Sequence, residues 1–127
     1  MKHILLAAAV AFVATIVVAA TPCERSVNRV GKCFWVHGRL MAYNGDPAFR
    51  IWPVGTHRLL GVNAPRGEEE ENPRFPAEVN AAWGPKFDAF STALFGDFLV
   101  CPFSRPRAGW MQLVCVAKAR RVIAAPP

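Results

Sequence analysis

The stretch that decides the fold is CFWVHGRLMAYNGDPAFRIWPVGTHRLLGV, residues 33–62. Apolar side chains recur at every second position of CFWVHGRLMA, residues 33–42, and this spacing predicts a β-strand. One face of that strand carries Phe34, Val36 and Leu40, which we expect to point into the core. The opposite face, with its tryptophan, histidine and arginine, is then expected to point outward or into a cleft.

Two turn signals divide the rest of this stretch into two further strands. Asn44-Gly45 is typical of a tight turn between antiparallel strands, and AFRIWP, residues 48–53, alternates as the second strand. A second turn at residues 54–56 leads into a third strand at residues 57–62. Short connections between successive strands predict an antiparallel meander.

A long irregular segment follows the meander. Residues 63–84 hold three prolines and four consecutive glutamates, and we expect a loop, with a short helical turn at 77–83. A helix is predicted for residues 86–95, because Phe87, Phe90 and Leu94 have helical spacing and Gly96 is a stop signal.

Two more strands are expected near the C-terminus. DFLVCPF, residues 97–103, and WMQLVCVAK, residues 110–118, flank a polar turn, and residues 119–127 are expected to form a flexible tail. The complete order predicts a mainly β domain with one helix, a disulfide-stabilised, five-stranded OB-like barrel. An open α+β sheet is the alternative that fits the same order.

The first twenty residues resemble a signal peptide. A basic start precedes an apolar run from Ile4 to Val18, and small residues at 18–20 predict cleavage before Thr21. The domain would then be residues 21–127, periplasmic or secreted, with no transmembrane span after cleavage. The alternative is an uncleaved inner-membrane anchor, since the apolar stretch of about 17 residues is at the short end of what spans a bilayer.

The four cysteines are Cys23, Cys33, Cys101 and Cys115. An even number in a small exported chain predicts two disulfides, and three connectivities are possible. We prefer Cys101 with Cys115, because both lie in the predicted hairpin. The spacings lack the close pairs that a zinc site needs, so no metal site is expected.

The charge of the chain is strongly basic outside one segment. There are 15 Lys and Arg against 9 Asp and Glu, and four of the acids are the glutamates at 68–71. A basic exported protein meets anionic polymers, lipid headgroups or nucleic acid. One basic group lies at the closing hairpin and tail: Arg105, Arg107, Lys118, Arg120 and Arg121.

Two family resemblances can be read from motifs. The segments at 33–40, 43–62, 101–103 and 111–116 resemble a family of small exported proteobacterial proteins of uncharacterised function, which implies export and no particular chemistry. In addition, NGDP (44–47) followed by RLLGVNAPR (58–66) is similar to thermonuclease-like OB-fold proteins. The pattern of that family runs Asp-Gly-Asp-Thr and then Arg-apolar-Asp-small-Pro-Glu.

The thermonuclease resemblance carries over only in part. It places Asp46 at a calcium-binding acid and Arg58 at the arginine that stabilises phosphate charge. Asn63 replaces the second calcium ligand, and Arg66 replaces the general base. A calcium ion needs several oxygen ligands, and hydrolysis needs a group that activates water, so these departures argue against catalysis.

No other catalytic or cofactor motif is present in the sequence. His37 and His57 lack metal-ligand spacing, and the serines at 26, 91 and 104 lack a nucleophile motif. We therefore expect no catalytic residues, no metal and no cofactor, although enzymatic activity is left open.

The remaining functional signal is a basic and aromatic strand face. It consists of Trp35, Arg39, Arg50, Trp52 and Arg58. OB barrels present such faces to oligonucleotides or oligosaccharides, with arginines neutralising anions and rings stacking. The alternative is structural: the tryptophans form a small second core that the arginine stems cover.

The function expected from the sequence is an exported binding or envelope-associated module that recognises an anionic polymer or an envelope protein. A divergent thermonuclease-like phosphodiesterase and a structural or protein-partner module are the alternatives.

Overall fold

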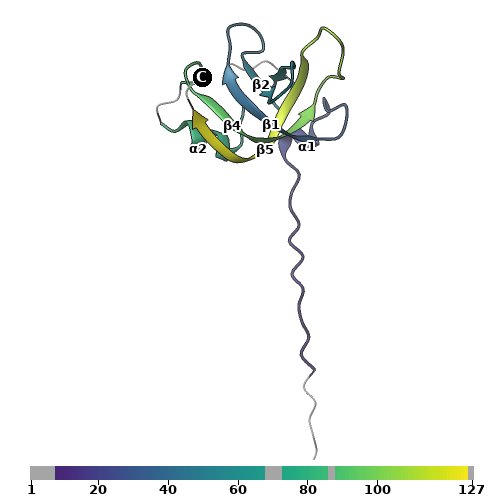
Figure 1. The fold of residues 1–127 in the computed structure, drawn as a ribbon. Helices are drawn as coiled ribbons and strands as arrows, with labels where there is room; N and C mark the ends of the chain where they lie inside the picture. The colour runs from purple at the N-terminus through teal and green to yellow at the C-terminus, as the bar shows by residue number, and fades with distance from the viewer. Residues whose placement is uncertain (1–7, 68–72, 86–87, 126–127) are drawn as a thin grey trace, which may run out of the picture.

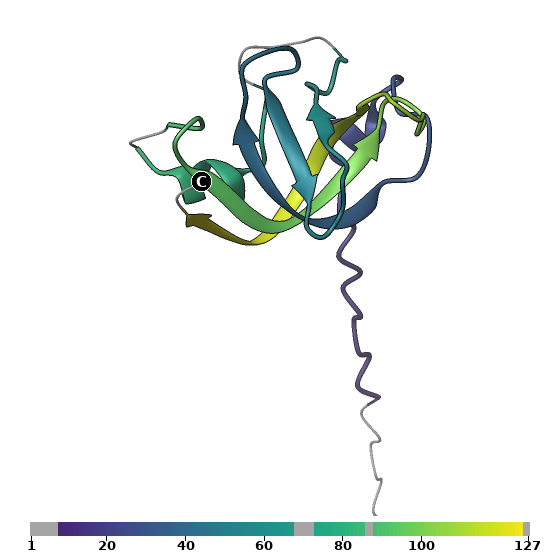
Figure 2. The same cartoon turned by 45° about the horizontal axis from the view of Figure 1, so that its top comes forward.

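The structure is a computed structural model that describes residues 8–67, 73–85 and 88–125. Five strands close into a barrel in the order β1-β2-β3-β5-β4 (Figures 1 and 2). The elements are α1 (Pro22–Arg25), β1 (Phe34–Ala42), β2 (Phe49–Pro53), β3 (Leu60–Val62), α2 (Ala77–Trp83), β4 (Ala93–Pro102) and β5 (Gln112–Ala125). The disulfide-stabilised, five-stranded barrel predicted from the sequence is confirmed.

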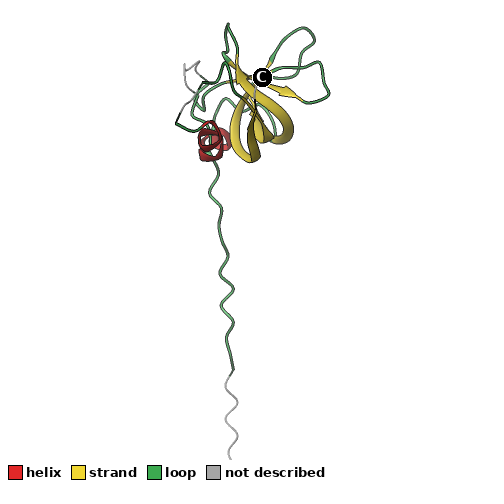
Figure 3. Ribbon diagram, turned by 60° about the vertical axis from the view of Figure 1, so that its left-hand side comes forward, coloured by secondary structure: helices red, strands yellow, loops and turns green. Residues whose placement is uncertain are grey.

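The barrel is antiparallel except where β3 meets β5. β1 pairs with β2 and β4, and the three residues of β3 run parallel to the start of β5. Figure 3 shows the curled sheet with the helical segments on its outside. The third strand is shorter than predicted, because residues 57–59 belong to the approach to β3.

The inward side chains follow the alternation in the sequence. The largest fully buried ones are Phe98, Leu40, Ile51, Leu60 and Leu94. Burial of a side chain of this size contributes about 1.5–3 kcal/mol, so this cluster supplies much of the driving force for folding. Phe34 departs from the prediction, since it is 39% exposed at the start of β1.

The helix between β3 and β4 is α2, and the helix predicted at 86–95 is wrong. Residues 89–91 form a turn, and Ala93 begins β4; Lys86 and Phe87 lie outside the described residues. The expected helical turn at 77–83 is the actual helix. It buries Val79 and Trp83 in the main core.

An aromatic cluster fixes α2 on the barrel. The ring centroids of Phe49, Phe75 and Trp83 are 5.1–5.8 Å apart. The Trp83 indole also donates to the Thr92 carbonyl at 3.2 Å. These contacts connect a β2 side chain to α2 and to the segments before and after it. The position of the helix therefore depends on tertiary packing and not on local sequence alone.

The fifth strand is longer than the sequence indicated. β5 continues to Ala125 and pairs with β4 as far as Ala93, so residues 119–125 are strand where a tail was expected. Residues 126–127 lie outside the described part. The extension brings Arg120 and Arg121 onto the barrel wall.

Two disulfides join the N-terminal segment to the last hairpin. Cys23 is bonded to Cys115 and Cys33 to Cys101, and the preference for Cys101 with Cys115 is therefore wrong. Those two residues are register partners of the β4–β5 ladder, so they were correctly placed side by side. The bonds span 92 and 68 residues. Cross-links of such loops restrict the unfolded chain by roughly 4–5 kcal/mol each.

The folded part of the chain begins at Thr21. Its side chain accepts from the Glu24 backbone, and the Glu24 carboxylate accepts from the Thr21 N–H at 3.2 Å, a capping box on α1. Residues 8–20 are exposed and extend away from the barrel (Figure 1). No helix in the described part of the chain is long and apolar enough to cross a membrane.

Candidate anion-binding surface

Arginine and aromatic side chains interleave on the outer surface of β1 and β2. Arg39 and Trp52 are cross-strand partners, and Arg50 lies on the same side of β2 as Trp52. Tyr43, directly after β1, completes a group of four that we call the arginine–aromatic face. Alternation explains its origin: where Leu40 and Ile51 point inward, their strand neighbours point outward.

Each arginine of this face lies against an aromatic ring. The guanidinium of Arg39 is 5.2 Å from the Trp52 ring centroid and donates to the Tyr43 hydroxyl at 3.3 Å. The guanidinium of Arg50 is 5.1 Å from the Tyr43 ring, and its Nε donates to the Pro47 carbonyl at 3.0 Å. In space, the four side chains therefore follow one another in the order Trp52, Arg39, Tyr43 and Arg50. Stacking orients the planar guanidinium groups of these two half-buried arginines.

The arginine–aromatic face leads into a cleft. Its walls are residues 57–59, before β3, and residues 106–112, from the β4–β5 loop; we call it the hairpin cleft. Its volume is about 790 Å³. Arg58 lines it and donates to Gln112 Oε1 at 2.8 Å.

A glycine allows the face and the cleft to meet. A Cβ on Gly61 would lie 2.5 Å from Pro47 Cγ and 3.0 Å from Met111 Sδ. The turn before β2 and the cleft wall can therefore both pack on β3 only because this position has no side chain. On the other side, the Trp52 indole donates to the Thr56 carbonyl at 2.7 Å, two residues before Arg58.

The far wall of the cleft repeats the arginine–aromatic pattern. The guanidinium of Arg107 lies 4.6 Å from the ring centroid of Trp110, and Trp110 is 67% exposed. An exposed tryptophan beside an arginine can stack on a base or a sugar while the arginine pairs with an anion.

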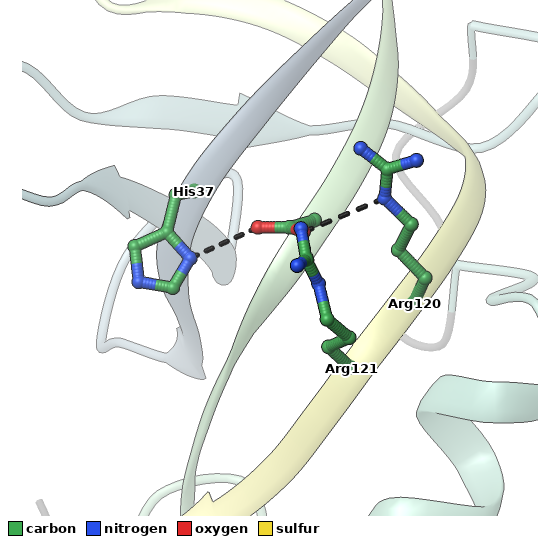
Figure 4. A network of polar contacts seen from close by, with 4 residues as sticks. His37, Arg120 and Arg121 are labelled. Carbon is green, nitrogen blue, oxygen red and sulfur yellow. Dashed lines mark hydrogen bonds and ion pairs between the residues drawn. The ribbon is translucent and has the colours of Figure 1, made fainter.

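Trp35 lies elsewhere, next to a carboxylate that holds three basic side chains. The guanidinium of Arg120 is 4.0 Å from the Trp35 ring. Its Nε is 3.4 Å from Asp97 Oδ2, and His37 Nδ1 is 3.0 Å from Asp97 Oδ1 (Figure 4). Arg121 pairs with the same carboxylate through Nε, at 2.9 Å, and through a terminal nitrogen. We call His37, Asp97, Arg120 and Arg121 the Asp97 cluster.

A β-bulge allows two consecutive arginines to reach one carboxylate. Regular alternation would put Arg120 and Arg121 on opposite faces of β5. The ladder shifts by one residue between Phe95 and Asp97, and Arg121 has a φ of 53°. The bulge and the left-handed backbone at Arg121 interrupt the strict alternation of side chains, so Arg120 and Arg121 both point to the outer face.

The cluster keeps Asp97 ionised. Hydrogen bonds from Arg121, and then from His37, lower the pKa of Asp97 below its usual value. The side chain of Asp97 is only 12% exposed, whereas those of Arg120 and Arg121 are 55% and 76% exposed. Asp97 is therefore an internal counterion for exposed arginines.

The five residues predicted as one binding face thus lie in three places. Arg39, Arg50 and Trp52 form one group, Arg58 lies in the hairpin cleft, and Trp35 stacks under Arg120. Guanidinium groups lie over both tryptophans, whereas the structural alternative expected aliphatic arginine stems to cover a second core, and Trp35 is 41% exposed.

Sequence reasoning missed three members of these sites, Tyr43, Asp97 and Trp110, and it named Arg107 only as part of the basic group at the closing hairpin. One signal was available for Asp97, because it is a single acid in the apolar run ALFGDFLVC. The aromatic residues flanking turns gave no comparable signal.

The positions similar to thermonucleases do not share a cavity. Arg58 lines the hairpin cleft, Arg66 lines a separate pocket near Thr21, and Asp46 lines neither. Asn63 is buried, and its Oδ1 has no hydrogen-bond partner in the described part of the chain. Within residues 8–67, 73–85 and 88–125, no group of three or more His, Cys, Asp or Glu could hold a metal ion.

No family model matches this chain, and neither a curated protein nor a solved structure does. Function has to be argued from the geometry of the barrel and its surfaces.

Proposed function

We propose that this protein is an exported module that binds an anionic polymer along the arginine–aromatic face and the hairpin cleft. The observation that carries the proposal is the group of stacked cations and rings formed by Trp52, Arg39, Tyr43 and Arg50, which the bond from Trp52 to Thr56 connects to the segment that enters the cleft at residue 57. A polymer needs such an extended surface, because each of its repeating charges gains from a separate cation.

No carboxylate among the described residues pairs with the arginines of this surface. In the described part of the chain, all ion pairs converge on Asp97. Arg39, Arg50, Arg58 and Arg107 are held by rings, carbonyls and an amide, none of which carries a negative charge. These four arginines are therefore the cations that an anionic ligand would meet.

Export is supported by the disulfides and by the N-terminus. Disulfides persist in oxidising compartments, and this barrel has two. The capping box starts at Thr21, the residue that would become the N-terminus after signal cleavage. Intact mass of the protein from the exporting host should correspond to residues 21–127; a mass that includes residues 1–20 would contradict cleavage.

Fluorescence anisotropy tests the binding proposal. The probes are a labelled 20-nucleotide single strand and labelled polygalacturonate, at low and at physiological salt, with neutral dextran as the uncharged polymer. We expect salt-sensitive binding of at least one polyanion and none of dextran. The double variant Arg50→Gln/Arg58→Gln should weaken binding at least tenfold.

A matched variant controls for net charge. Arg29→Gln/Lys32→Gln removes the same charge from two exposed residues outside both surfaces, and its affinity should stay near that of the parent. Equal weakening by the two double variants would show that only net charge matters. Absence of binding to every polyanion at low salt would refute the proposal.

A further inference from the structure

A second cavity lies on another part of the barrel, beside α1. It is about 460 Å³ in volume, within the range of small-molecule sites. Its lining comes from α1, from the segment after β3, from the segment before α2 and from β5. We call it the Thr21 pocket, because Thr21 lines one side of it.

The lining of the Thr21 pocket is apolar with a basic edge. Pro65, Phe75, Pro76, Val116 and Ala117 supply hydrocarbon surface. Three arginines also line it: Arg25, Arg66 and Arg74.

The three guanidinium groups have no carboxylate partner in the described part of the chain, where every ion pair involves Asp97. The guanidinium group of Arg25 donates to the Ala20 carbonyl. Four glutamates separate Arg66 from Arg74 in the sequence, and they lie outside the described residues.

The pocket is held in place by a hydrogen bond from Asn28, three residues after α1, and by the disulfide of Cys23. Asn28 Nδ2 donates to the Arg66 carbonyl at 2.7 Å, which fixes the segment after β3 against the N-terminal segment. Cys23 is bonded to Cys115 and lines the pocket itself. A cavity with a cross-linked wall is largely pre-formed, which lowers the entropic cost of binding.

From this arrangement we propose that the Thr21 pocket binds an amphipathic carboxylate, with its aliphatic chain on the apolar lining and its carboxylate on the arginines. Guanidinium groups match carboxylates through paired hydrogen bonds, and the apolar lining rewards burial of methylene groups. This site is separate from the polymer-binding surface, and the inference does not rest on the proposed function.

Processing of the N-terminus would add to the basic edge. If the chain is cleaved before Thr21, the acceptor that Ala20 gives Arg25 is removed, and Arg25 becomes available to a ligand. The new ammonium group at Thr21 would lie beside the Glu24 carboxylate, which already accepts from that nitrogen at 3.2 Å.

Isothermal titration with dodecanoate below its micelle concentration tests the inference. The purified protein is used, with its N-terminus determined by mass. Dodecanol and dodecyltrimethylammonium are the neutral and cationic comparisons, and dodecyl phosphate distinguishes a carboxylate site from a general anion site. We expect dodecanoate to bind at least tenfold more tightly than dodecanol, and the cation to bind more weakly still.

Single substitutions locate the binding. Arg66→Gln and Arg74→Gln should each weaken dodecanoate binding by roughly tenfold, as expected for loss of a charge-assisted hydrogen bond. Arg29→Gln is the matched control and should leave the affinity unchanged. All three side chains are exposed, so these variants should fold, and thermal unfolding checks this. Amide chemical shifts of Val116 and Ala117 should move on titration.

Three results would overturn the inference. They are equal affinity for dodecanoate and dodecanol, no dodecanoate binding by the folded protein, and binding that the arginine substitutions do not alter. Binding that appears only after Glu68–Glu71 are replaced by glutamine would also overturn it, since the protein's own carboxylates would then be the partners of these arginines.

Discussion

Two arginine-rich regions of this barrel use the same residue types in opposite ways. In the Asp97 cluster, Arg120 and Arg121 share one carboxylate, and Trp35 lies under Arg120. In the arginine–aromatic face, Arg39 and Arg50 also lie on rings, but no carboxylate among the described residues is paired with them. The first region balances part of its own charge, and the proposal is that the second meets an anionic partner.

The difference lies in the position of the arginines and not in their number: one group lies around a carboxylate, and we propose that the other binds a ligand. Asp97 joins β4 to β1 through His37 and to β5 through two arginines. Arg39 and Arg50 instead bond to residues on or beside their own strand pair. Loss of an Asp97 contact should therefore affect folding, whereas loss of a face contact should affect binding.

The largest expected effect on stability is that of Asp97→Ala. It leaves two arginines and a histidine without their common acceptor, next to a bulge whose backbone they help to fix. We expect a clear fall in the melting temperature, measured by circular dichroism. A melting temperature equal to that of the parent would mean that the Asp97 cluster does not contribute to the stability of the fold.

Lowering the pH should reproduce part of the loss of stability expected for Asp97→Ala. The pKa of Asp97 is below its ordinary value of 3.8 in the folded protein, so its contribution is complete above 3.8 and is lost as the pH falls through the folded pKa. Asp97→Asn should therefore be less stable than the parent at pH 7, and the difference should shrink below about pH 3.8. Urea unfolding at pH 7, 4 and 2.5 measures this. A difference that stays constant over this range would contradict the assignment.

A smaller effect is expected for Arg39→Met in the arginine–aromatic face. The substitution removes a cation–π contact worth about 0.5–1 kcal/mol and the 3.3 Å hydrogen bond from Arg39 to the Tyr43 hydroxyl. It also removes Arg39 Nε, which is buried without a hydrogen-bond partner in the described part of the chain. The free energy of unfolding should therefore change by less than about 1 kcal/mol. Arg121→Met, the same replacement in the Asp97 cluster, should cost more; the reverse order would break the comparison.

The barrel itself was predictable because its determinants are local. Period-two alternation and turn residues marked five strands, and the cysteine count indicated two bonds. The helix position was not predictable, since the spacing of Phe90 and Leu94 imitates a helix although Leu94 is a core residue of β4. Packing of Phe75 and Trp83 against Phe49, which is distant from both in the sequence, decided the position of the helix.

The candidate sites were predictable only where alternation is regular. Arg39, Arg50 and Trp52 follow the pleat and lie on one side of β1 and β2, and binding at this face stays a prediction. The grouping of Arg120 with Arg121 depends on a bulge and a left-handed residue, which a rule of strict alternation excludes. The cysteine pairing failed for a similar reason: register placed Cys101 beside Cys115, but the N-terminal segment supplies both bonding partners.

The salt dependence of polyanion binding tests the central claim most directly. The dissociation constant for the 20-nucleotide strand is measured from 20 to 200 mM salt for the parent, Arg50→Gln/Arg58→Gln and Arg120→Gln/Arg121→Gln, at a temperature where all three are folded. Loss of two arginines that contact the polymer should reduce the slope of log K against log salt by roughly 1.4. We predict this reduction for the first double variant and an unchanged slope for the second. Equal reductions in both would contradict the account, because the two regions would then be interchangeable sources of charge.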